Sequence, residues 1–332
     1  MDETLYTIGP FTITPFSVAV CVSAIWGCIV LLLLSGKKHI RKNTAFSLMP
    51  LTILLGVFLG HALYAALRVL IYPLDYEQPL VFVLNPGVGG FMFFGVLAGA
   101  ALSCLIVSGT RHYQFSQLMS VLFPALLITL AFIRFAEPLC LLGKGPETEG
   151  GFFPLSYAPE AEYPEDRYIP EFFYAGLYTL LIGIWNIRSI LTKHGKKRST
   201  LFFFVLYLAG QMFFEVFRQD EYVNATSLIT FIRLNQLIAV ILLGVCLVYA
   251  IKKCMHRVSA GFIIVRCLVF VISVGACIGL QFLFDKPLPL MGETIWFPDW
   301  LVYVLLALSA VGMGWPIVSM LSRKPNLNRS RS

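Results

Sequence analysis

The chain has 332 residues, of which 58% are hydrophobic and only 13% are charged. Soluble domains are about one quarter charged, so this composition excludes an ordinary soluble protein. The formal net charge of +7 does not indicate a nucleic-acid partner, because the Lys and Arg residues lie mainly in short clusters between apolar runs, as in the cytoplasmic loops of membrane proteins.

Long apolar runs predict about nine membrane-spanning helices. Runs such as 17–34 and 234–251 approach the ~20 residues that a helix needs to cross a bilayer. They are apolar on every side, whereas the strands of a membrane barrel alternate apolar and polar residues. The predicted fold class is therefore an all-α, polytopic integral membrane protein. Its spans are, in chain order, 14–35, 48–72, 89–109, 117–141, 171–191, 200–217, 229–251, 261–283 and 300–321.

The charges predict an N-terminus outside and a C-terminus in the cytoplasm. This orientation puts every Asp and Glu outside or at an outer helix end, and it puts all the basic clusters inside. The N-terminal sequence lacks the basic region of a signal peptide, so we expect the first span to be retained. The basic clusters are 36–42, 193–199, 252–257 and 322–332.

Two long outer connections separate the predicted helices. The segment 143–170 is rich in acidic residues, Pro and aromatics, and it forms either an ordered lid or a mobile loop. The segment 285–300 carries Trp296 and Trp300, which suit the membrane interface. The eight cysteines have no ligand spacing, so they indicate neither a disulfide framework nor a metal site, and we expect no cofactor.

Charged side chains inside spans are costly, which makes them candidates for function. In the predicted orientation four arginines fall in the outer half of the bilayer, where positive residues are least expected. A guanidinium stays charged and offers a planar fork of donors that matches phosphate oxygens. Together these residues predict a binding site for a phospholipid headgroup. They are Arg68, Arg134, Arg218 and Arg233, with the acids Glu137 and Glu215.

Each of these residues also has a purely structural interpretation. Arg134 with Glu137, and Arg218 with Glu215, have the i,i+3 spacing of a helical ion pair. His61 is the one histidine well inside a predicted span, and a lone histidine between helices is more often a packing residue than a base. The small residues Gly95, Gly99 and Ser103 at four-residue spacing predict a close helix–helix contact.

Six segments, in order along the chain, resemble the prolipoprotein diacylglyceryl transferase family. The resemblance covers roughly residues 5–255 and rests on the order of these weak matches more than on any single motif. The segments are YTIGPFTITPF (6–16), LLGVFLG (54–60), GGFMFFGVLAG (89–99), LFPALLITLAFIRFAEPL (122–139), IPEFFYAGLY (169–178) and AGQMFFEVFRQDEY (209–222).

The resemblance implies a bacterial cytoplasmic membrane enzyme that moves a diacylglyceryl group from phosphatidylglycerol to the lipobox cysteine of a preprolipoprotein. Its partners would be that phospholipid, the preprolipoprotein signal peptide and the bilayer. Residues 1–257 would form the seven-helix transferase domain, with 258–332 as an added hairpin and basic tail. The family's site positions carry over to Arg134, Tyr207, Glu215, Arg218, Tyr174 and Pro170.

The chain also departs from the family pattern. The family's histidine falls on Phe94, one of its arginines falls on Gln211, and its signature Asn falls on Glu137. Glu137 or His61 would then have to accept the thiol proton, and Arg68 or Arg233 would replace the lost cation. The alternative is a catalytically inactive paralogue that binds phospholipid or lipoprotein. A transporter is the third hypothesis, disfavoured because the charges lie toward one face.

Overall fold

The computed structural model confirms a polytopic all-α membrane protein. Within the described residues it contains nine long helices, and the predicted spans coincide with them in order. Eight of these helices are long and apolar enough to cross a membrane, judged by length and composition. The structure describes residues 5–8, 11–71, 90–159, 165–192, 199–219, 233–256, 258–285, 288–290, 293–295 and 298–322.

The remaining long helix, α6, has Asn186 and Arg188 in its last two turns, which lower its hydropathy. The helices are α1 (Pro15–Lys37), α2 (Lys42–Ile71), α4 (Phe93–Arg111), α5 (Phe115–Ala136), α6 (Glu171–Leu191), α7 (Thr200–Phe217), α8 (Leu234–Cys254), α9 (Ala260–Asp285) and α10 (Asp299–Leu321). A 3₁₀ turn, η2 (Glu137–Cys140), follows α5.

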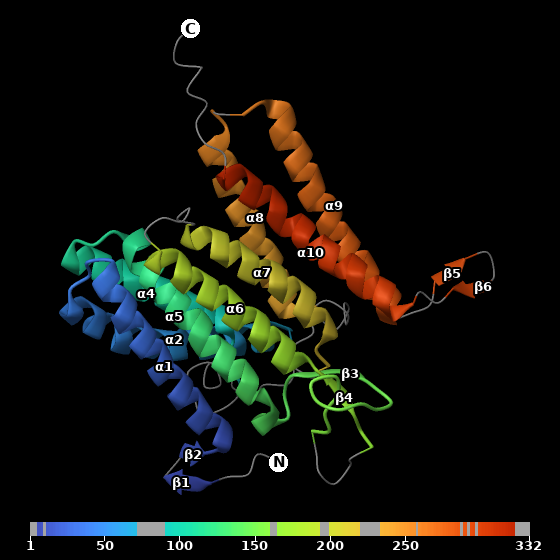
Figure 1. Cartoon of the computed structure of the whole chain (residues 1–332), viewed down its shortest axis with the longest axis horizontal. Coiled ribbons are helices and arrows are strands. Elements are labelled where there is room, and N and C mark those ends of the chain that lie inside the picture. Colours follow the sequence, from blue (N-terminus) through green and yellow to red (C-terminus); the bar gives the residue numbers. More distant parts are fainter. Residues whose placement is uncertain are drawn as a thin grey trace. The chain divides into compact units, whose positions relative to one another are not determined.

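Three short antiparallel strand pairs lie outside the long helices (Figure 1). Each pair is a separate two-stranded sheet, and the described residues form no larger sheet. The pairs are β1 (Tyr6–Ile8) with β2 (Phe11–Ile13), β3 (Lys144–Glu147) with β4 (Tyr168–Pro170), and β5 (Leu288–Leu290) with β6 (Glu293–Ile295).

The chain divides into two compact units, each with its own packing. The first unit comprises Met1–Thr200 and Phe217–Val223, and the second comprises Leu201–Val216 and Asn224–Ser332. The boundary predicted at residue 257 separates the transferase-like part of the sequence from the added hairpin and tail, and it stays a prediction. The predicted orientation of the two termini also stays a prediction. Trp296, most of the 193–199 cluster and nearly all of the basic tail lie outside the described residues.

In the first unit, α5 forms the centre of the packing. It is the most buried of the eight spans, and α1 and α6 both pack against it (Figure 1). Glycines allow these close contacts. A Cβ at Gly27 of α1 would overlap the Thr129 hydroxyl of α5, and a Cβ at Gly176 of α6 would lie 2.7 Å from the ring of Phe135. The central helix therefore holds its C-terminal end, which carries Arg134, in a fixed place.

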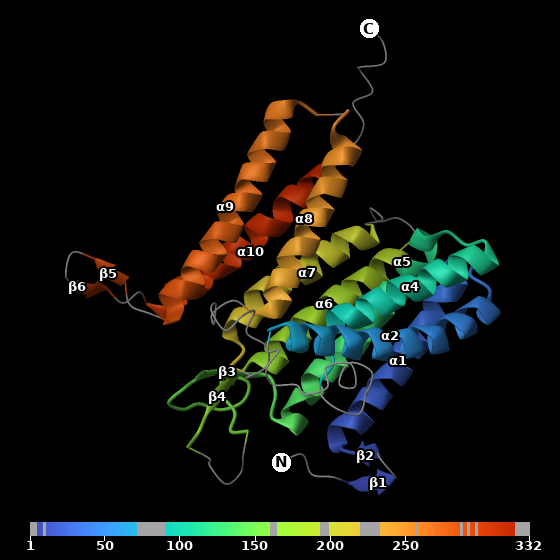
Figure 2. The ribbon, with the colours of Figure 1, turned by 180° about the vertical axis from the view of Figure 1, so that it is seen from behind.

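The tightest helix contact in the first unit joins α2 to α4 (Figure 2). A Cβ at Gly95 would overlap the carbonyl oxygen of Leu59 and lie 2.7 Å from the Cα of Gly60. A Cβ at Gly99 would lie 2.5 Å from the carbonyl oxygen of Leu55. Across the same contact the hydroxyls of Thr52 and Ser103 are hydrogen bonded at 2.8 Å. The predicted small-residue packing face of α4 is therefore confirmed.

We expect the Gly95→Ala variant to be less stable than the natural protein. Backbone atoms occupy the space of the new methyl group, so the two helices must separate, and overpacking of this kind costs about 1–3 kcal/mol. Gly109, on the same helix, has no neighbouring atom within 4 Å of an added Cβ. Gly109→Ala is therefore the matched control, and helix propensity favours it by up to about 1 kcal/mol. Thermal unfolding in detergent would measure both, and equal midpoints would contradict the predicted overlap.

The segment between α5 and α6 is ordered over its described residues, 143–159 and 165–170. The amide of Thr148 donates to the carbonyl of Arg167 at 2.9 Å, and Tyr157 and Tyr168 exchange two backbone hydrogen bonds. The amide of Phe172, in the first turn of α6, donates to the carbonyl of Gly143 at 3.1 Å. Of the two alternatives that the sequence left open, the ordered segment is the one observed for these residues.

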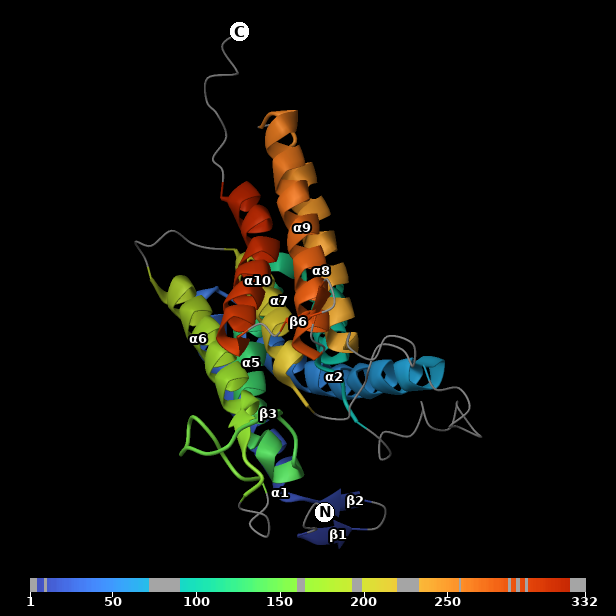
Figure 3. The same cartoon turned by 90° about the vertical axis from the view of Figure 1, so that its right-hand side faces the viewer.

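The second unit contains most of α7 together with α8, α9 and α10 (Figure 3). Helices α9 and α10 form a hairpin in which Gly312 of α10 lies against Ser273 of α9. Helix α10 also packs on α7, where a Cβ at Gly314 would lie 3.5 Å from Ala209. On α9, Arg266 lies between the rings of Phe262 and Trp315, 4.2 Å from each ring centre.

Candidate functional site

The candidate site begins where α5 ends. The helix ends at Ala136, and Glu137 starts the 3₁₀ turn, in which Pro138 lacks the amide hydrogen that a continued α-helix would use. One turn back on α5 is Arg134, whose Nη1 donates to Glu137 Oε1 at 3.0 Å. Both side chains are almost entirely buried, with 6% and 10% exposed. The i,i+3 ion pair anticipated from the sequence is thus confirmed.

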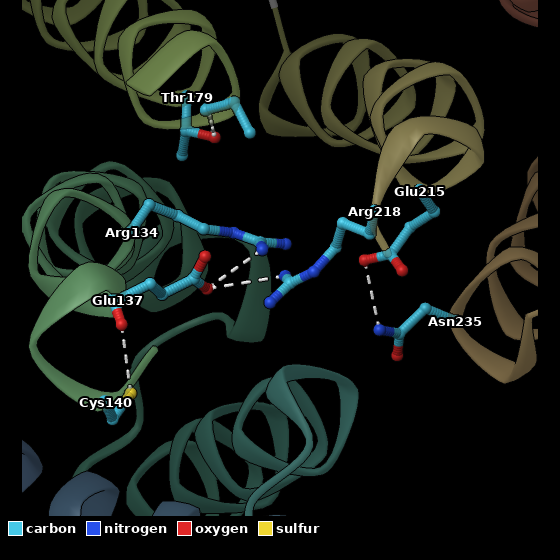
Figure 4. A network of polar contacts seen from close by, with 8 residues as sticks. Arg134, Glu137, Cys140, Thr179, Glu215, Arg218 and Asn235 are labelled. Atoms are coloured by element: carbon cyan, nitrogen blue, oxygen red, sulfur yellow. Dashed lines mark hydrogen bonds and ion pairs between the residues drawn. The ribbon is translucent and has the colours of Figure 1, made fainter. Parts of the chain in front are cut away.

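A second arginine reaches the same carboxylate from a distant part of the chain. Arg218 follows the end of α7 in extended backbone conformation, and its Nη1 donates to Glu137 Oε1 at 3.4 Å. The adjacent amide of Gln219 donates to the carbonyl of Lys144 at 2.8 Å, which fixes the backbone next to Arg218. Figure 4 shows the two guanidinium groups pointing toward one carboxylate. We call Arg134, Glu137 and Arg218 the arginine–carboxylate cluster.

The arginine–carboxylate cluster has the chemical character of an anion site. Its two guanidinium groups and one carboxylate together carry a formal charge of +1. Both guanidinium groups contact the same carboxylate oxygen. The Arg218 side chain is only 12% exposed, so its charge interacts in a medium less polar than water. A guanidinium offers five N–H donors in one plane, and phosphate oxygens match this geometry. Two such groups side by side suit a phosphate diester or monoester.

Other predicted site residues belong to the second unit. Asn235 Nδ2 donates to Glu215 Oε1 at 3.1 Å, so this acid of α7 is joined to the first turn of α8 (Figure 4). Tyr207 and Gln211 are buried on α7, with 1% and 2% of their surface exposed. Arg233 is half-buried at the N-cap of α8. For these residues the predicted roles stay predictions.

His61 and Arg68 lie on α2 in the first unit. The His61 ring is buried, with Nδ1 3.4 Å from the carbonyl oxygen of Gly90 and the ring centre 5.8 Å from that of Phe91. These contacts fit the packing role that the sequence favoured for this histidine. Arg68 is half-buried in the last turn of the helix. The structure therefore brings together two of the four predicted arginines, through Glu137, and the headgroup roles of Arg68 and Arg233 stay predictions.

Tyr174, on the first turn of α6, holds the segment that precedes it. Its hydroxyl donates to the carbonyl oxygen of Pro154 at 2.9 Å. We expect Tyr174→Phe to lower the stability of this segment by about 1 kcal/mol, the usual contribution of one hydrogen bond. Faster trypsin cleavage after Arg167 in the folded protein would report the change. Tyr249→Phe, at a ring that is 52% exposed on α8, is the control, and equal cleavage rates would contradict the expectation.

Three contacts at or near these residues were not predictable from the sequence. The pairing of Arg218 with Glu137 joins residues 81 positions apart, and no local spacing indicates it. The hydrogen bond from Asn235 to Glu215 joins residues 20 positions apart on two different helices. Gly143 has a φ of +76°, and an added Cβ would lie 2.8 Å from Glu137 Oε2. The glycine that follows the span carrying Glu137 was the available signal for a tight turn next to that acid. Only glycine adopts a backbone with positive φ without strain.

Comparison with known proteins identifies the family. The sequence model of the family described as prolipoprotein diacylglyceryl transferase matches residues 3–252. A phosphatidylglycerol–prolipoprotein diacylglyceryl transferase of Halalkalibacterium halodurans is 26% identical over 73% of this chain and 83% of its own length. The enzymes with this name from Listeria monocytogenes and Prochlorococcus marinus are each 24% identical, over 67% and 65% of the chain and 80% and 78% of their own lengths.

The matched region agrees with the extent of the resemblance seen in the sequence. It begins before α1 and reaches the last turn of α8, so it includes the complete arginine–carboxylate cluster. The α9–α10 hairpin lies beyond it. A match over this length, which is most of the chain, shows common descent and not only a shared composition. The chain therefore belongs to the prolipoprotein diacylglyceryl transferase family.

Proposed function

We propose that the chain transfers a diacylglyceryl group from phosphatidylglycerol to the lipobox cysteine of a preprolipoprotein in the bacterial cytoplasmic membrane. The family and its relatives carry the name of this transferase. The observation that carries the proposal for this chain is the convergence of Arg134 and Arg218 on Glu137. Two buried guanidinium groups at the end of a membrane helix suit the phosphate of a lipid headgroup.

The reaction assigns a role to each part of the arginine–carboxylate cluster. The cysteine sulfur attacks the glyceryl carbon that is esterified to phosphate, so an S–C bond forms and a C–O bond breaks. The bonding electrons leave with the phosphate oxygen, and glycerol phosphate departs with an additional negative charge. Arg134 and Arg218 stabilise that charge, which develops in the transition state. Glu137 holds the two guanidinium groups side by side.

The thiol must lose its proton, because the thiolate is the nucleophile. The position that matches the family's histidine is Phe94, which has no ionisable group and is buried on α4. Glu137 and His61 are the groups of the first unit that we propose as alternative acceptors of this proton. Either of them fulfils the requirement only if the lipobox cysteine approaches within hydrogen-bond distance or through one water molecule.

The direct test is transfer by the purified full-length protein in vesicles that contain phosphatidylglycerol. A synthetic lipobox peptide should gain the mass of one diacylglyceryl group, and a peptide with serine in place of the cysteine should gain none. Vesicles of phosphatidylcholine alone are the control for the lipid. The same protein should support growth of bacteria depleted of their own transferase. No modified peptide from folded protein, in both assays, would reject the catalytic proposal.

A second function follows if the chemistry has been lost. The replacements at Phe94 and Gln211 favour a paralogue that binds phospholipid or lipoprotein at the outer leaflet without reacting. Such a protein would still bind phosphatidylglycerol vesicles or lipid micelles, and mutation of Arg134 would weaken that binding. Binding without transfer would therefore favour the paralogue, and transfer at any rate above the serine-peptide control would exclude it.

A further inference from the structure

The ordered segment between α5 and α6 exposes an apolar tip. Phe152, Phe153, Pro154 and Leu155 are consecutive, and 73% of Phe152, 52% of Phe153 and 59% of Leu155 is exposed. Large apolar groups gathered on a surface usually mark a contact with another protein, a membrane or a ligand. Neither the family match nor the proposed reaction assigns these four residues a role. We call residues 152–155 the apolar tip.

Hydrogen bonds from both sides fix the apolar tip in its exposed position. Arg167 Nη1 donates to the carbonyl of Gly151 at 2.7 Å, and the hydroxyl of Tyr174 donates to that of Pro154 at 2.9 Å. Within the tip, the amide of Leu155 donates to the carbonyl of Phe152 at 2.7 Å, which closes a turn. Ordering a segment costs conformational entropy, and these hydrogen bonds offset part of that cost for the tip.

A continuous series of aromatic rings joins the tip to the membrane-spanning helices. The ring centres of Phe153 and Phe173 are 4.9 Å apart, and those of Phe173 and Phe135 are 6.1 Å apart. The series continues from Phe135 to Phe132 at 6.5 Å and from Phe132 to Trp26 at 6.3 Å. Trp26 and Phe132 are 49% and 37% exposed on helices long enough to cross a bilayer. Their exposed faces therefore meet lipid.

We propose that the apolar tip inserts into the leaflet in which α5 ends and α6 begins. The occupant of its surface is phospholipid, because the tip continues the lipid-facing aromatic surface past the helix ends. Phe173 and Phe135 lie in the first turn of α6 and the last turn of α5, which places the tip at the depth of the membrane interface. Aromatic side chains are enriched at that depth. The proposal rests on the fold and does not depend on transferase activity.

Insertion of the tip has a consequence for the arginine–carboxylate cluster. The same segment begins at Gly143, which lies against both Phe172 and the Glu137 carboxylate. The carbonyl oxygen of Lys144 accepts a hydrogen bond from the amide of Gln219, the residue after Arg218. An anchored tip therefore keeps the segment 143–159 close to the bilayer and next to the two arginines. Lipid headgroups of the same leaflet would lie at the level of the cluster.

The proposal can be tested by photocrosslinking of the full-length protein in vesicles of phosphatidylcholine and phosphatidylglycerol. The benzophenone amino acid p-benzoylphenylalanine replaces Phe152 in one variant and Glu149 in the other. Glu149 is exposed in the same segment but outside the tip. Excited benzophenone abstracts hydrogen from nearby C–H bonds and relaxes without product in water. Mass spectrometry should therefore show a phospholipid adduct at position 152 in several-fold higher yield than at position 149.

Two outcomes would overturn the proposal. Lipid adducts of equal yield at the two positions would show that the tip is no nearer to the bilayer than the rest of the segment. Adducts at position 152 that contain only protein would show that the tip contacts a polypeptide. Unchanged thermal unfolding of both variants would confirm that they are folded, so that a low lipid yield counts against insertion.

Discussion

The Arg134→Lys variant is expected to transfer diacylglyceryl groups about 10²–10³-fold more slowly than the natural protein, the usual effect of removing one donor to a developing oxyanion. Lysine keeps the positive charge but lacks the planar fork that bonds a carboxylate and a phosphate together. Arg134 is 5% exposed and donates to Glu137 at 3.0 Å. Because the site is buried, water from bulk solution cannot supply the N–H donors that the lysine lacks. The loss should appear in kcat more than in KM, because the charge develops in the transition state.

The matched control for this variant is Arg111→Lys. Arg111 is exposed in the last turn of α4, outside the arginine–carboxylate cluster, and the chemical change is the same. Initial rates of lipobox-peptide modification in phosphatidylglycerol vesicles would compare the two. Both variants should unfold within a few degrees of the natural protein. A folded Arg134→Lys protein with the control's rate would show that the guanidinium of Arg134 does not bind the departing phosphate.

The Glu137→Gln variant is expected to lose about 3–5 kcal/mol of folding free energy, the range seen when one partner of a buried ion pair is removed. Glutamine has almost the same shape as glutamate but no charge. Arg134 and Arg218, 6% and 12% exposed, would then face each other without the carboxylate that both contact. Transfer should fall as well, because nothing would hold the two guanidinium groups in their shared orientation. The midpoint of thermal unfolding in detergent measures the first effect.

Two further variants test whether the loss of stability comes from the unpaired positive charges around Glu137. Glu149→Gln makes the same change at an exposed residue of the neighbouring segment and should leave the unfolding midpoint unchanged, because surface charges contribute little. The double variant Glu137→Gln with Arg218→Gln removes one positive charge along with the negative one, so it should recover part of the lost stability. Equal stability of Glu137→Gln and Glu149→Gln would show that the ion pairs do not hold the cluster together.

Membership of the family and retention of the reaction are separate questions for this chain. The family match rests on residues spread through most of the sequence, whereas the reaction depends on a few side chains at one site. Phe94 and Gln211 are two of the positions at which the resemblance predicts a departure from the family, and both are buried. The resemblance predicts that Arg134 and Arg218 stand at arginine positions of the family. Phosphate binding is therefore the part of the proposed function that the structure supports most strongly, and proton removal is the part that the peptide assay must test.

Local sequence was sufficient for the helices and for most of their ends. The spans expected at 171–191 and 200–217 agree with α6 and α7, because hydropathy and the polar residues around each run are local properties. Two ends differ. Helix α2 starts at Lys42, not at residue 48, and continues through Pro50, which lies in the helix interior and lacks the amide hydrogen for one intrahelical hydrogen bond. Helix α5 ends at Ala136 before Pro138, and the predicted residues 137–140 form a 3₁₀ turn.

By itself the sequence determined that this protein crosses a membrane many times and that its arginines within apolar runs are the residues to examine. Both conclusions follow from the cost of placing polar groups in hydrocarbon. That cost can be judged from the residues of each segment alone, without knowledge of its neighbours in space. Only the tertiary structure decided that Arg218 joins Arg134 on one carboxylate, and that the rings of the 143–159 segment continue the surface of α1 and α5. Such contacts depend on which distant segments pack together, and packing is decided by the shapes of whole helix faces.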